Sequence, residues 1–210
     1  MTSMLSAEQA YALLRKYRIK AINTGLAKTF PEAELLAENI GFPLVLKIDA
    51  AQIVHKTDVG CVKIAYSQDK LEEVYKKVTS NAKKITKDIN GILVQEFVRG
   101  LEAITGSAMD GQFGKVMMFG SGGVLTQVFK DVSFRLVPIS KEDAESMIDD
   151  TKVSQLLNYR GNNIDKNKIV DVLLKLNNLV QNENIHEMDI NPLFLNDNGA
   201  FAADVRIVKN

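Results

Sequence analysis

The sequence has few of the features that mark secreted, membrane or nucleic-acid-binding proteins. Its single cysteine, Cys61, cannot form an internal disulfide or by itself a zinc site, so we expect a reducing, cytoplasmic environment. No apolar stretch approaches the roughly 20 residues that span a bilayer, and the N-terminus lacks a signal-peptide core. The 26 basic and 26 acidic residues leave no net charge to attract nucleic acid or an anionic membrane. We therefore expect a soluble, unprocessed protein.

The sequence also lacks the pattern of a simple dinucleotide-binding fold. Strands and helices do not alternate steadily, and no Gly-x-Gly-x-x-Gly motif follows the first predicted strand. The 210 residues, of which 46% are hydrophobic, are enough for one domain or for two lobes. We predict an α+β protein of two lobes, with the boundary near Arg99-Gly100.

Capping signals and apolar periodicity predict five helices. Ser6 and Gln9 form a capping-box pattern that opens the first helix. The second has Thr29 before it, Pro31 in its first turn and Gly41 at its end. The others are expected at 69–85, after Ser140, and at 165–181. Apolar runs predict strands at 43–48, 62–66, 92–98, 103–109, 115–120, 186–195 and 200–208.

Two residues of the first lobe are candidates for chemistry. Lys47 interrupts an apolar run, so it either meets an anion such as a phosphate or points to solvent from one sheet face. His55 lies in the polar loop VHKTDVG, where a neutral imidazole is a competent phosphoryl acceptor, although loop histidines are commonly just solvated. His186 is interpreted as structural or solvated.

A glycine-rich loop and an arginine follow the predicted strand at 115–120. Gly122 and Gly123 would let backbone N–H groups approach a phosphate, or they make a plain turn. Arg135 would pair with a phosphate or with Asp131.

The C-terminal hairpin brings oxygen ligands together. If Asp197-Asn198 form its loop, Asn191 falls opposite Asp204. If Asn198-Gly199 form the loop, Leu193 falls opposite Asp204. Both registers place Asp189 and Asn191 on the face that carries Asp204, because strand side chains alternate. Such a cluster suits Mg²⁺. The alternative is a set of polar residues near a turn, and a bulge would break the cluster.

Several segments together resemble, in order and spacing, the ATP-grasp β subunits of ADP-forming acetyl-CoA synthetases, within the NDP-forming acyl-CoA synthetase family. They are FPLVLKIDAAQIVHKTDVG, LVQEFVRGLEAITG, QFGKVMMFGSGG, FKDVSFRLVPISKEDAESMI and EMDINPLF. The resemblance implies one ATP-grasp domain over 1–210, with lobes 20–98 and 99–210, helix 7–18 packing on the second lobe, and a nucleotide cleft between the lobes.

The resemblance also implies a reaction. Acyl-CoA, ADP and phosphate give the free acid, CoA and ATP through an acyl phosphate and a phosphohistidine, with Mg²⁺. In that family the acyl-CoA chemistry belongs to an α subunit or to a fused α region, and the resemblance implies an α subunit as partner in an α2β2 hetero-oligomer. His55 matches the histidine that delivers the phosphoryl group to ADP, and Asp189 the aspartate that holds the phosphohistidine. Asn191 and Asp204 match metal ligands of related succinyl-CoA synthetases.

The same match assigns nucleotide-binding residues. Lys47 resembles the phosphate lysine, Glu102 the acidic residue of the nucleotide site, and Gln95, Glu96 and Val98 the hinge that holds the adenine. The sequence departs from the family pattern at Cys61, which replaces a glycine, and at Leu101 and Gln127.

Two other functions remain open at this point. One is a non-catalytic regulatory ATP-grasp module. The other is a ligase that joins a carboxylate to an amine, for which the VHKTDVG histidine has no role.

Overall fold

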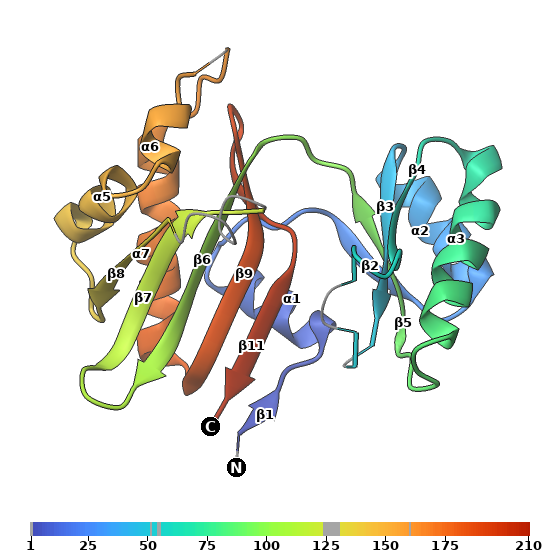
Figure 1. Ribbon diagram of the computed structural model, residues 1–210, viewed down its shortest axis with the longest axis horizontal. Helices are drawn as coiled ribbons and strands as arrows, with labels where there is room; N and C mark the ends of the chain where they lie inside the picture. Colours follow the sequence, from blue (N-terminus) through green and yellow to red (C-terminus); the bar gives the residue numbers. More distant parts are fainter. Residues whose placement is uncertain (1, 51, 54–55, 124–130, 160) are drawn as a thin grey trace. The chain divides into compact units, whose positions relative to one another are not determined.

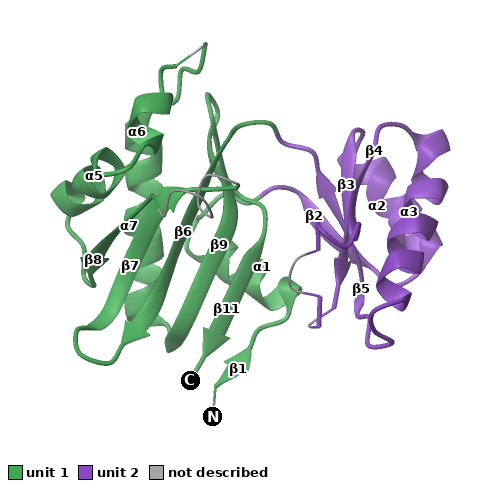
Figure 2. Ribbon diagram, viewed as in Figure 1, with its two compact units in different colours: residues 1–21, 99–210 green, residues 22–98 purple. Residues whose placement is uncertain are grey.

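The computed structural model describes residues 2–50, 52–53, 56–123, 131–159 and 161–210. The chain divides into two compact units, shown in Figure 2, and each is described by itself. Unit 1 comprises residues 1–21 and 99–210, and unit 2 comprises residues 22–98. The first helix therefore belongs to the same unit as the C-terminal half of the chain.

Unit 1 is built on an antiparallel sheet with the strand order β1-β11-β9-β6-β7-β8 in the described part of the chain, and β10 also pairs with β9. Its strands are β1 (Ser3–Met4), β6 (Leu101–Asp110), β7 (Gly114–Ser121), β8 (Val132–Leu136), β9 (Ile185–Asn196), β10 (Gly199–Ala202) and β11 (Val205–Lys209). Its helices are α1 (Ala7–Lys16), α5 (Lys141–Asp149), α6 (Val153–Leu156) and α7 (Lys166–Asn182).

The helices α1 and α7 lie against one face of this sheet (Figure 1). Strand residues such as Met117, Phe119 and Ile190 point to that face, where they form one hydrophobic core with Leu14 and Leu173 of the two helices. We call it the helical face. Because strand side chains alternate, the residues between these core positions lie on the opposite face, which we call the distal face.

Local capping explains why the helices begin where they do. Ser6 and Gln9 form the predicted capping box of α1, and Ser140 forms one with Asp143 at α5.

The carboxylate of Glu183, at the end of α7, accepts hydrogen bonds from Lys16 at 2.6 Å and from Lys209 at 2.8 Å. These contacts hold the pKa of Glu183 at about 2, well below its ordinary value.

Unit 2 is a four-stranded sheet among the residues described, in the order β2-β5-β3-β4, with two helices. The elements are β2 (Thr24–Ala27), α2 (Phe30–Ile40), β3 (Leu44–Asp49), β4 (Val62–Ala65), α3 (Gln68–Lys83) and β5 (Gly91–Glu96). Buried residues of β3 and β5 form a second core with those of α2 and α3. The predicted helix signals are confirmed here, since Thr29 caps α2 and Gly41 ends it with a φ of 86°.

The five predicted helices are all present, and the chain also forms the short strands β1 and β2 and the short helix α6. The strand predicted at 200–208 divides into β10 and β11 at Ala203-Asp204. Across the described ranges, no helix combines the length and the hydropathy needed to cross a membrane.

Candidate active site

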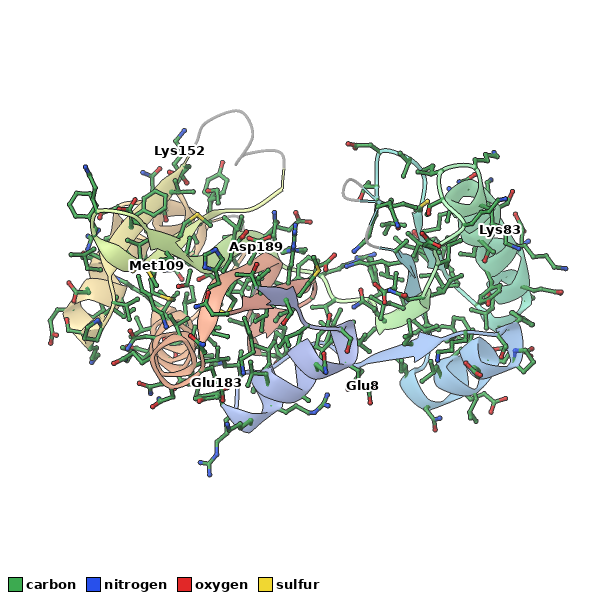
Figure 3. The ribbon with its side chains drawn as sticks, turned by 90° about the horizontal axis from the view of Figure 1, so that it is seen from below. Glu8, Lys83, Met109, Lys152, Glu183 and Asp189 are labelled. Carbon is green, nitrogen blue, oxygen red and sulfur yellow. The ribbon has the colours of Figure 1, made fainter. Side chains whose placement is uncertain are left out.

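Asp189, Asn191 and Asp204 lie together on the distal face of unit 1. Gly199 pairs with Asn196 and Val205 with Ile190, so the loop is Asp197-Asn198 and the first of the two predicted registers is confirmed. The backbone N–H of Asn191 donates to the carbonyl oxygen of Asp204 at 3.1 Å. The register of β9 against β6 shifts between Ile190 and Leu193, a stretch that includes Asn191, but the pairing of β9 with β10 and β11 keeps one register across it. Figure 3 shows Asp189 on the side of the sheet away from α1 and α7.

The carboxyl group of Asp189 has a raised pKa. Burial is the largest cause, the negative charges of Asp204 and Glu187 add to it, and Arg206 opposes it. Arg206 is the cross-strand neighbour of Asp189 on β11. A carboxylate whose charge is disfavoured in this way gains more from a hydrogen-bond donor or a cation than an exposed carboxylate would.

The donor set fits Mg²⁺ better than a metal held by protein alone. Within the described ranges, no group of three or more His, Cys, Asp and Glu side chains is arranged to hold a metal ion. Asp204 and the Asn191 amide nevertheless offer oxygen donors on one face beside the disfavoured charge of Asp189. Mg²⁺ commonly takes one or two carboxylates and completes its shell with water and phosphate oxygens.

Glu102 and the glycine loop meet at the start of β6. The N–H of Gly122 donates to the carbonyl oxygen of Glu102 at 2.8 Å. Gly123 has a φ of 61°, and a Cβ added to it would lie 2.6 Å from a carboxylate oxygen of Glu102. A Cβ added to Gly122 would lie 2.8 Å from the backbone carbonyl carbon of Glu102, so this glycine allows the close approach, whereas Gly123 is favoured by its left-handed φ. Strand pairing with Phe194 places Glu102 on the distal face, the face of Asp189.

Arg135 is not brought together with these residues. It pairs with Met117, a core residue, so it lies on the helical face of the sheet. Its guanidinium donates to Asp150 at 2.7 Å and to the hydroxyl of Ser146, both next to or within α5. Asp131, the alternative partner, instead accepts from Ser121 and from the backbone N–H of Lys152. The geometry of Arg135 is that of an anchor for α5.

Lys47 lies on the sheet face of unit 2 that points away from the core. The neighbouring Leu46 and Ile48 belong to the core with α2 and α3, so alternation turns Lys47 the other way. Its cross-strand neighbours are Val62 and Leu93, and its side chain is half-buried between them. Lys47 therefore lies on the outward sheet face and is partly removed from water, and its role toward a phosphate stays a prediction.

Gln95, Glu96 and Val98 form the last segment of unit 2. Gln95 is fully buried, and its side-chain amide donates to the hydroxyl of Thr24 at 3.1 Å. The Glu96 carboxylate accepts from the side-chain amide of Asn23 at 2.9 Å, and the Glu96 N–H donates to the Asn23 carbonyl. These contacts fix the backbone just before Val98, the residue that ends unit 2.

His55 lies outside the described residues, and so does Gln127. The chain on either side of the histidine is well anchored, because Ile53 and Cys61 are both buried in the core of unit 2. Cys61 has no strained backbone, since Arg18 is the one non-glycine residue with a positive φ in the described part of the chain. The replacement of glycine at position 61 therefore needs no change in backbone shape.

Sequence reasoning missed Glu187, Arg206 and Gly106 as neighbours of Asp189. Glu187 lies two residues before Asp189 on β9, and Arg206 lies two residues after Asp204 in the strand predicted at 200–208, so alternation alone would have found them. Gly106 is different, because its pairing with Asp189 joins two strands that are far apart in the sequence.

The sheet and helices of each unit, together with the carboxylates on one sheet face of unit 1, are those of an ATP-grasp domain. A model of the ATP-grasp domain family matches residues 1–208. The chain is 43% identical over 208 residues to acetate–CoA ligase [ADP-forming] II of Archaeoglobus fulgidus. This alignment covers 98% of this chain and 30% of that protein. It is 38% identical to acetate–CoA ligase [ADP-forming] II subunit beta of Pyrococcus furiosus, covering 99% of this chain and 92% of that one.

Two solved structures of acetyl-coenzyme A synthetase 1 from Ca. Korarchaeum cryptofilum match as well. One, with coenzyme A and Ca-AMPCP, has a TM-score of 0.91 and 41% identity over 99% of this chain and 93% of that chain. The other, with coenzyme A and Mg-AMPPCP, has a TM-score of 0.83 and 40% identity with the same coverage. The chain belongs to the family of ATP-grasp β subunits of ADP-forming acetate–CoA ligases. It spans about 30% of the length of the Archaeoglobus relative.

Proposed function

We propose that this chain is the nucleotide-binding β subunit of an ADP-forming acyl-CoA synthetase, for which acetyl-CoA is the first substrate to test. Its step is phosphoryl transfer between a phosphohistidine at His55 and ADP, in which the N–P bond breaks as a bond to the terminal phosphate oxygen of ADP forms. The reaction as a whole is acyl-CoA + ADP + phosphate = acid + CoA + ATP. The observation that carries the proposal is the convergence of Asp189, Asn191 and Asp204 on one face.

The relatives support the same step. The Pyrococcus protein that matches over nearly its whole length is named as a β subunit of this enzyme. The Korarchaeum structure with Mg-AMPPCP is described as having its phosphohistidine segment pointing towards the nucleotide-binding site. His55 lies in VHKTDVG, between two segments anchored in the core of unit 2.

The residues of unit 1 have distinct roles in this proposal. Asp189, which matches the family's phosphohistidine-holding aspartate, is the carboxylate that would fix the imidazole tautomer during transfer, with the other nitrogen carrying the phosphoryl group. Asn191 and Asp204 hold Mg²⁺. When bound, this ion neutralises charge on the nucleotide phosphates. Glu102 completes the acidic surface near the Gly122-Gly123 turn.

The residues of unit 2 bind the nucleotide. The ammonium group of Lys47 binds phosphate oxygens, and its half-buried position strengthens that interaction because fewer water molecules compete. Gln95 and Glu96 hold the chain so that the backbone near Val98 can bind the adenine edge. A phosphate role for Arg135 has no support from its position beside α5.

The deciding experiment is phosphorylation of the isolated chain. Incubation with γ-labelled ATP and Mg²⁺ should give an acid-labile, alkali-stable phosphoprotein, as expected of phosphohistidine. The label should be absent from His55→Ala and retained in His186→Ala, the matched control. Label that persists in His55→Ala would place the nucleophile elsewhere, and a wild type without label would favour the regulatory alternative.

The partner is an α subunit that binds CoA and carries out the acyl-CoA chemistry, and we propose an α2β2 assembly in the cytoplasm. The naming of the Pyrococcus relative as a β subunit supports a partner chain. Light scattering of the complex purified from the native cell would test the stoichiometry, because a mass other than that of two chains of each kind would refute it.

A further inference from the structure

The distal face of unit 1 carries an exposed apolar patch, which we define as Val116, Met118, Phe134 and Leu136. Val116 pairs with Leu136 and Met118 with Phe134 across the neighbouring strands β7 and β8, so the four side chains form one continuous group. Phe134 is 53% exposed and Leu136 is 54% exposed. Water-exposed aromatic and aliphatic side chains that are contiguous in this way mark interaction surfaces more often than isolated ones do.

The patch and the candidate active site share the same rows of the sheet. One row runs from Phe134 through Met118 and Gly106 to Asp189, and the next runs from Leu136 through Val116 and Ala108 to Glu187. Small residues on β6 therefore separate an apolar surface on β7 and β8 from carboxylates on β9. An apolar centre beside a charged edge is the usual composition of a protein–protein interface.

We propose that this patch is the docking surface for the CoA-binding α subunit, and that the complementary surface of that subunit is apolar with lysine or arginine at its edge. The inference rests on the proposed function and names the part of the chain that holds the partner. Contact there would place the partner next to Asp189, along the same rows of one sheet face.

The lengths of the relatives indicate why such a surface is needed. In the Archaeoglobus protein the matching region is 30% of one chain, so a peptide bond keeps it with the remainder. In the Pyrococcus protein the match covers 92% of a separate subunit, so only noncovalent contacts can hold the remainder. The Pyrococcus subunit must therefore expose apolar area to its partner in order to bind it stably, and the patch defined above offers such area in this chain.

A second copy of this chain is a less suitable occupant. In a two-fold contact the same surface appears on both sides, so one interface would hold the Glu187 and Asp189 carboxylates of both copies, with Arg206 offsetting only part of that charge. Like charges across an interface disfavour binding, whereas a basic edge on a different partner would favour it.

The test compares two double variants of the full chain. Phe134→Gln with Leu136→Gln alters the patch, and Leu35→Gln with Tyr66→Gln alters two exposed apolar residues of unit 2 as the matched control. The probe is the separately expressed chain from the same organism whose sequence aligns with the remainder of the Archaeoglobus ligase. Its dissociation constant for each variant is measured by calorimetry, and its effect on oligomeric state by light scattering.

We expect the patch variant to bind at least roughly 30-fold more weakly than wild type, as loss of central interface residues does, with the control unchanged. The isolated patch variant should still be labelled by ATP, because neither residue belongs to the nucleotide site. An unchanged dissociation constant would overturn the docking assignment. So would a wild-type dimer that the patch variant converts to monomer, because a second copy would then be the occupant. A wild type that binds the partner but takes no label would contradict only the proposed function.

Discussion

Replacing Gly106 by alanine should damage the sheet at the point where it carries Asp189. A Cβ at this position would lie 2.3 Å from the carbonyl oxygen of Met188, and real Cβ atoms essentially never approach within 3.0 Å. Backbone atoms cannot rotate away, so β6 and β9 would have to separate by about 0.7 Å. A backbone hydrogen bond of about 2.9 Å stretched by that amount no longer meets the geometric limit.

The cost follows from these distances. Overpacking of this kind costs about 1–3 kcal/mol, and each lost hydrogen bond adds about 1 kcal/mol. The lower entropy of alanine in the unfolded chain returns about 0.4–1 kcal/mol. We therefore expect a net loss of about 2 kcal/mol, which corresponds to a fall in Tm of about 4–8 °C for a chain of this size.

The assay is thermal unfolding followed by circular dichroism, with Gly111→Ala as the matched control. A Cβ at Gly111, in the turn between β6 and β7, would meet nothing within 4 Å, so its Tm should stay close to that of wild type. Labelling by ATP should also fall in Gly106→Ala, because the displaced strand carries Asp189. Equal Tm values for the two variants would refute the claim that Gly106 is required by the approach of β9.

Three further variants test electrostatic contacts. Glu183→Gln should cost about 1–2 kcal/mol at pH 7, since the carboxylate binds two lysines, one largely exposed. Because the pKa of Glu183 is about 2 when folded and higher when unfolded, the difference from wild type should fade between about pH 4.5 and 2 in urea titrations at each pH. Asp204→Asn should lower the pKa of Asp189, measured by NMR, without returning it to its ordinary value, since burial remains the larger cause. The same variant should weaken Mg²⁺-nucleotide binding. An unchanged pKa of Asp189 would show that the charge of Asp204 does not act on it. Arg135→Gln should lower the free energy of unfolding by about 1 kcal/mol through loss of the contact with Asp150, and weaker nucleotide binding by calorimetry would contradict its structural role.

Local signals allowed much of the fold to be predicted. The caps at Ser6, Thr29 and Ser140 and the stop at Gly41 are found where the sequence predicts them, because each depends on residues within one turn. The strand β2 was missed because Thr24–Ala27 is short and contains a glycine. It is a strand because its backbone pairs with β5, about 70 residues away, and a sequence pattern carries no record of that pairing.

The candidate site follows the same division between local and distant contacts. A two-residue hairpin loop and strand alternation were enough to bring Asp189, Asn191 and Asp204 to one face. The opposite orientation of Arg135 depends on the register of β8 against β7. That register was not fixed by any turn the sequence reveals, so the arginine could equally have faced the site.

The raised pKa of Asp189 shows how the two kinds of contact combine. The charge of Asp204 reaches it through the predictable hairpin, whereas its burial depends on tertiary packing, including the close approach of β6 at Gly106. Burial of this carboxylate beside Asp204 and Glu187 costs stability that Arg206 offsets only in part, so a further cation or hydrogen-bond donor at this place would be favourable. A phosphohistidine and a magnesium-bound nucleotide would supply both. The unfavourable charge is therefore itself an argument that this face of the sheet serves binding and catalysis.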